Sequence, residues 1–145
     1  MDENIELLEY IYKNSEMGVY TIKKLLKDLK DKENKIKKLA DYQMKEYNRF
    51  QDEAKKIIKK NKYELKSNSL MAKIGSSIGI KNEVEKDNSD ASIAHMLTEG
   101  ITMGIVDMET KLKNYKDTVK EDIYKLGEDF LKFQQQEVEK LKEFM

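Results

Sequence analysis

Three residue types are missing from this 145-residue sequence, which contains no cysteine, no proline and no tryptophan, and it has a single histidine. Without cysteine the chain cannot form disulfides, use a thiolate nucleophile, or hold a cysteine-ligated zinc ion or iron–sulfur cluster. Without proline, no position forces a helix to end for want of a backbone N–H. The abundant lysine, glutamate and leucine are good helix formers. These observations predict an all-α protein, and the length suits one domain spanning residues 1–145.

Charge of one sign is also lacking, because 28 basic residues balance 28 acidic ones. A neutral chain has no long-range field that attracts a polyanion, and Arg49 is its only arginine, the residue that best recognises phosphate and guanine. We therefore expect no nucleic-acid partner. No apolar run approaches the roughly 20 residues that cross a bilayer, and residues 1–4 are acidic where a signal peptide is basic. We expect no membrane partner and a cytoplasmic location.

Apolar residues recur at three- and four-residue steps in four stretches, which is the pattern of helices with one buried face. The predicted helices cover residues 3–30, 33–64, 90–116 and 119–144. Ser89 or Asp90 is the expected N-cap of the third helix. Thr118 and Glu121 have the spacing of a capping box before the fourth. The sequence thus predicts four long helices.

The second and third helices are separated by residues 65–89, which is longer than a tight helix–helix connection needs. Apolar residues inside this crossover segment predict a short helix over residues 69–81, broken near Gly75 or Gly79. We expect this helix to pack on the other four as a lid or strut.

An internal similarity divides the chain into two halves. Residues 17–31 match residues 103–117 at a constant offset of 86, and the match includes a Met-Gly pair in each copy. Helix propensity does not favour glycine, so the shared pair favours a true duplication of one helical hairpin. Chance similarity between lysine-rich amphipathic helices is the alternative.

Two hairpins joined by a long crossover have the connectivity of a ferritin-like four-helix bundle. Through residues 10–18, from Tyr-Ile-Tyr to Met-Gly, and residues 93–105, from Ile-Ala-His-Met-Leu to Met-Gly-Ile, the chain resembles small uncharacterised ferritin-like or rubrerythrin-like proteins of low-GC anaerobic bacteria. The resemblance covers most of the chain but includes no catalytic motif. It implies an antiparallel four-helix bundle, and it implies no particular activity.

The di-iron chemistry of ferritin-like proteins needs a Glu on each of two helices and a Glu-x-x-His on each of the other two. Here His95 is the only histidine and Ser92 stands three residues before it, so the standard di-iron ligands are missing. His95 and Glu99 lie one helical turn apart and are the candidates for binding iron, manganese or zinc. Both lie off the apolar stripe, and two ligands are too few for a stable site. We therefore favour an outward-facing pair without a metal.

One further motif matches the sequence pattern of a catalytic site. Residues 75–79 read Gly-Ser-Ser-Ile-Gly, which matches the Gly-x-Ser-x-Gly nucleophile elbow. That elbow works on a strand-to-helix turn in a central sheet, and the sequence contains no series of strands that would supply one. We expect no catalytic residue and no cofactor.

Glycines in the apolar stripes indicate where aromatic rings pack. Counting from the two hairpin turns sets each glycine opposite a pair of rings, and we expect the rings to fill the space that metals occupy in ferritin-like proteins. The expected packing is Gly18 with Tyr47 and Phe50, and Gly104 with Phe130, Phe133 and Gln134.

The third predicted helix is apolar over more than one face, which indicates that another element covers it. The extra apolar residues are Ile93, Met96, Met103 and Val106. The crossover segment is the first candidate for the cover, and a second copy of the chain is the next.

These observations favour a non-catalytic helical bundle that acts through contacts with another protein or through self-association. The alternative is a ferritin-like metal-binding or redox protein with a degenerate site at His95 and Glu99. An elongated coiled-coil rod is a third possibility, and its hydrodynamic radius would be much larger.

Overall fold

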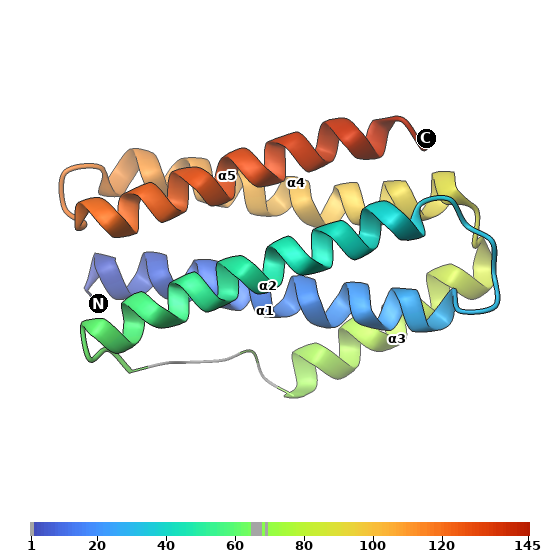
Figure 1. Cartoon of the computed structure of the whole chain (residues 1–145), viewed down its shortest axis with the longest axis horizontal. Helices are drawn as coiled ribbons and strands as arrows, with labels where there is room; N and C mark the ends of the chain where they lie inside the picture. Colours follow the sequence, from blue (N-terminus) through green and yellow to red (C-terminus); the bar gives the residue numbers. More distant parts are fainter. Residues whose placement is uncertain (1, 65–67, 69) are drawn as a thin grey trace.

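The computed structural model describes residues 2–64, 68 and 70–145, and this part of the chain contains five α-helices and no strand. The prediction of an all-α protein is confirmed. The helices are α1 (Glu3–Asp28), α2 (Lys37–Lys60), α3 (Leu70–Lys86), α4 (Asp90–Tyr115) and α5 (Glu121–Lys142) (Figure 1).

The four long helices form two antiparallel hairpins that pack on each other (Figure 1). The first hairpin is α1 with α2, and the second is α4 with α5. Helices α2 and α4 run in the same direction, so the chain returns along the length of the helices between them (Figure 1). Helix α3 lies on this return path and packs mainly against α1, while its C-terminal half also contacts α4.

Helix α3 is longer than the expected 69–81 and continues unbroken through Gly75 and Gly79. Its buried or half-buried positions include Ser76, Ile80 and Val84 at four-residue steps, so the packed face extends beyond residue 81. A glycine inside a helix costs about 1 kcal/mol relative to alanine, which burial of the apolar side chains offsets. Residues 65–67 and 69 of the predicted crossover lie outside the described part of the chain.

The start of α4 is tied to the turn of the first hairpin. Ser89 is the N-cap, and its Oγ accepts a hydrogen bond from the Ser92 N–H at 3.2 Å. Asp90 has a different role, because its carboxylate accepts hydrogen bonds from Asn34 Nδ2 at 2.9 Å and from the Lys35 N–H at 3.2 Å. One side chain thus joins the two hairpins at this end.

The expected capping box of Thr118 and Glu121 does not form. Helix α5 begins after Lys120, which has no side-chain cap bond. The Thr118 hydroxyl donates to the Glu3 carboxylate, and Asn4 Oδ1 accepts from the Lys120 N–H at 2.7 Å. The N-terminal turn of α1 lies beside the α4–α5 turn and supplies acceptors for the Thr118 hydroxyl and for the Lys120 N–H.

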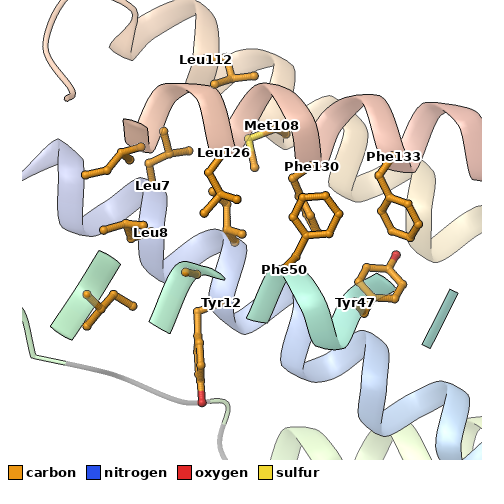
Figure 2. Packing of buried hydrophobic residues seen from close by; sticks show 14 of the residues in the cluster. Leu7, Leu8, Tyr12, Tyr47, Phe50, Met108, Leu112, Leu126, Phe130 and Phe133 are labelled. Atoms are coloured by element: carbon orange, nitrogen blue, oxygen red, sulfur yellow. The ribbon is translucent and has the colours of Figure 1, made fainter. Parts of the chain in front are cut away.

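Four aromatic rings from α2 and α5 form the middle of the core (Figure 2). Phe50 packs edge-on against Phe130 with ring centroids 5.0 Å apart, and Tyr47 packs edge-on against Phe133 at 5.2 Å. Edge-to-face pairs of this kind contribute about 0.5–1.5 kcal/mol beyond the area that they bury. The rings thereby hold the first hairpin to the second.

Candidate functional site

The two repeated glycines have different neighbours. A Cβ atom on Gly18 would lie only 2.6 Å from Cγ of Tyr47, so glycine is the residue that lets this ring approach α1. At Gly104 the nearest atoms are Asn14 Nδ2 and Gln134 Nε2, each 3.0 Å from the position of a Cβ. Of the neighbours expected at Gly104, Gln134 is confirmed as one of the nearest, whereas no ring atom is among the three nearest atoms. Amide side chains lie there, because the phenylalanines of α5 pack towards the rings of α2.

A cluster of buried polar side chains lies beside the aromatic rings. Gln43 Nε2 donates to Glu137 Oε1 at 3.2 Å, and Gln134 Nε2 lies 3.5 Å from the Tyr47 hydroxyl. Glu137 is 1% exposed, and its other carboxylate oxygen lies 2.9 Å from Lys140 Nζ, which reaches the solvent. The buried charge is thus paired, as a carboxylate in a protein interior must be.

Burial also controls the protonation of Tyr47. Loss of solvation raises the pKa of this phenol to about 12, although the hydrogen bond with Gln134 acts in the opposite direction. The phenol is therefore neutral at physiological pH.

Two oxygens of the cluster lack a partner in the protein. They are Gln43 Oε1 and Gln134 Oε1, and both are buried. A buried acceptor without a hydrogen bond costs about 1–3 kcal/mol, so an unpartnered oxygen indicates a place where another molecule can donate.

Gln43, which carries one of these oxygens, lines a pocket. The pocket has a volume of about 240 Å³ and lies between α1, α2, α3 and α4. Its wall is formed by Asn14, Met17, Gly18, Thr21, Ile22, Leu25, Gln43, Tyr47, Ser76, Ile80, Met96, Leu97, Gly100 and Ile101. The sequence places Gln43 on a buried stripe, but no spacing in it indicates that four helices leave a space beside this side chain.

The metal candidates lie on the outer surface of α4. His95 and Glu99 are both exposed and border a shallow groove that also includes Met103, Val106 and Asp107. Within residues 2–64, 68 and 70–145, no group of three or more histidine, aspartate or glutamate side chains is arranged to hold a metal ion. The structure therefore adds no third ligand to the pair.

The four interface candidates fall into two pairs. Ile93 is buried in one cluster with Ile80 of α3, and Met96 is half-buried against the same cluster. Met103 and Val106 are 72% and 57% exposed. Helix α3 thus covers the N-terminal half of α4, and it leaves the outer face of the C-terminal half uncovered.

The Gly-Ser-Ser-Ile-Gly segment lies inside helix α3 and makes no strand-to-helix turn. Ser77 Oγ is 3.1 Å from the Tyr20 hydroxyl on α1, so this serine has a structural contact. The described part of the chain has no strand to support a nucleophile elbow, so residues 75–79 do not form one.

Comparison with known proteins found no family model, curated protein or solved structure that matches the chain. None of the helices in the described residues is both long and apolar enough to cross a membrane.

Proposed function

We propose that the chain is a cytoplasmic, ferritin-like four-helix bundle without di-iron ligands, and that it acts by self-association through α3 and α4. The ferritin-like part is supported by the two antiparallel hairpins, the long return path between them and the common direction of α2 and α4 (Figure 1). The absence of a third ligand near His95 and Glu99 favours a binding role over metal chemistry.

The distribution of exposed apolar side chains is the observation that carries this proposal. Seven large hydrophobic residues are exposed in the described part of the chain, and five of them lie on α3 and α4. The five are Met71, Ile74, Ile78, Met103 and Val106. Exposed apolar residues that gather on neighbouring elements mark a surface used for binding, and methionine suits an adaptable contact.

A second copy of the chain fits this surface because each copy supplies two different apolar faces. Met71, Ile74 and Ile78 follow the i, i+3, i+7 spacing and form one exposed ridge on α3. The outer face of α4 has the shallow groove that contains Met103 and Val106. A two-fold axis seats the ridge of each copy on the groove of the other, which gives two identical contacts and a closed dimer.

Charge also permits this pairing. The chain has no net charge, so two copies do not repel each other. Glu99 and Asp107 border the groove, and Lys81 follows the ridge by one helical turn. Reciprocal seating brings charges of opposite sign to the edges of the contact, where they favour the correct register.

Sedimentation velocity of the full chain over a range of concentrations tests the proposal. We expect a reversible dimer in the wild type and a monomer in Met103→Lys, because the lysine places a charge in the apolar groove. Met145→Lys is the matched control, since Met145 is an exposed methionine outside α3 and α4. A wild type that stays monomeric, or a Met103→Lys variant that dimerises as well as the control, would show that the proposal is wrong.

A further inference from the structure

The pocket between α1, α2, α3 and α4 reaches from the surface into the core. Gly100 at its mouth is exposed, while Met17 of α1 and Ser76 of α3 are half-buried. Gln43 and Leu25 are fully buried and lie in the same wall. This gradient of burial describes a cleft with an open side and an enclosed floor, the shape that encloses a small molecule.

Gln43 gives the floor of the pocket a defined polarity. Its Nε2 donates to Glu137 Oε1, and a carboxylate accepts hydrogen bonds without donating any. The amide is therefore oriented with its nitrogen towards Glu137, and its oxygen has no hydrogen-bond partner in the protein. Gln43, which lines the pocket, thus carries a fully buried acceptor that a ligand with a hydroxyl or N–H group can satisfy.

The remaining wall selects for a neutral and largely apolar molecule. No aspartate, glutamate, lysine or arginine occurs among the described residues that line the pocket. A charged ligand would lose its solvation there without gaining a counter-ion. An engineered apolar cavity of about 150 Å³ binds benzene, so a pocket of about 240 Å³ has room for one or two rings.

We propose that this pocket is a binding site for a small, neutral, largely apolar molecule that donates one hydrogen bond to Gln43 Oε1. Helix α3 forms one side of the site through Ser76 and Ile80. Met17 and Met96 lie in the wall on α1 and α4, where flexible methionine side chains adapt to the shape of a ring. The site is independent of the self-association surface, which faces outward.

Paired probes test the hydrogen bond directly on the full-length wild type. Phenol and indole each carry one donor on an aromatic ring, whereas anisole and 1-methylindole have similar shapes without the donor. Isothermal titration calorimetry should detect phenol or indole and show about tenfold weaker binding of its methylated partner, which is the usual effect of one hydrogen bond. No measurable binding of phenol and indole, or equal affinity within both pairs, would refute the proposal.

A pair of glycine variants tests the location. No atom lies within 4 Å of the Cβ position at Gly100 or at Gly75, so a side chain can start at either place without a clash. Gly100→Leu fills the mouth of the pocket and should abolish binding. Gly75→Leu is the matched control, because Gly75 lies on α3 outside the pocket wall, and it should bind as the wild type does. Equal binding by both variants would show that the probe occupies another place.

Replacement of the acceptor completes the test. In Gln43→Leu the preference for phenol over anisole, or for indole over 1-methylindole, should fall from about tenfold to about one, because no acceptor is left to distinguish them. A preference that survives in the folded variant would contradict the role of Gln43. If Gln43→Leu fails to fold, the paired probes on the wild type and the Gly100→Leu result decide the question without it.

Discussion

Two alanine substitutions, Gly18→Ala and Gly100→Ala, are expected to have opposite effects on stability. Both glycines lie inside long helices, so alanine brings each the same gain in helix propensity. Their surroundings differ, because a Cβ at residue 18 would lie 2.6–2.9 Å from three ring atoms of Tyr47, whereas residue 100 has no atom within 4 Å of that position.

The structure gives the size of the difference. Alanine replaces glycine in a helix interior with a gain of about 0.8–1 kcal/mol. Tyr47 is 4% exposed, and its contacts with Phe130 and Phe133 oppose a movement of the ring away from residue 18. Overpacking a core of this kind costs about 1–3 kcal/mol. Gly100→Ala should therefore stabilise the protein by up to about 1 kcal/mol, and Gly18→Ala should be about 1–3 kcal/mol less stable than Gly100→Ala.

Urea unfolding followed by circular dichroism measures both free energies under the same conditions. The propensity gain cancels when the two variants are compared, so their difference reports the contact with Tyr47 alone. In thermal unfolding the same difference corresponds to roughly 2–4 °C for each kcal/mol. If Gly18→Ala proves as stable as Gly100→Ala, then the ring of Tyr47 does not pack on residue 18 and the described packing of α1 on α2 is wrong.

Four further outcomes follow from the structure. Phe130→Ala should destabilise the chain by about 3–5 kcal/mol in urea unfolding, because it removes a fully buried ring. Asp90→Ala should lose about 1–2 kcal/mol, since backbone and amide donors at the first hairpin turn lose their acceptor, and unchanged stability would contradict this link. The raised pKa of Tyr47, about 12 against 10 unfolded, means that folding favours the protonated phenol. This contribution to the free energy of unfolding is present below pH 10 and is lost as the pH rises towards 12, by up to roughly 2–3 kcal/mol. Between pH 9 and pH 11 the free energy of unfolding should therefore fall less in Tyr47→Phe than in the wild type. Metal analysis of the purified protein should find no stoichiometric iron, manganese or zinc, and a metal that disappears in His95→Ala would restore the metal-binding alternative.

Much of the local structure follows from periodicity. Four long helices are expected from apolar residues at three- and four-residue steps, and each differs from the observed one only near its ends. The position of Gln43 on a buried stripe is also readable from the sequence. The same steps continue through Ile80 to Val84 in α3, where two glycines suggest a break that does not occur.

Contacts between distant segments do not follow from periodicity. At the start of α5 the Lys120 N–H donates to Asn4, more than a hundred residues away, because the start of α1 lies beside the α4–α5 turn. Likewise, Asp90 is a sensible N-cap in the sequence, yet its carboxylate bonds to the turn of the other hairpin. A polar side chain bonds to whichever donor is nearest in the folded molecule, and spacing in the sequence shows only the donors within the same segment.

The sequence alone establishes the helices, the buried faces and the missing di-iron ligands, because each depends on residue types and on spacing within one segment. The uncovered half of α4 and the pocket beside Gln43 depend on how far α3 extends and where it packs. That placement results from the burial of Ile80 and Val84 in one cluster with residues of α1 and with Ile93 of α4, and periodicity within one helix does not contain such contacts. The composition therefore shows which chemistry this chain lacks the residues for, whereas its candidate binding sites form only when the helices pack together.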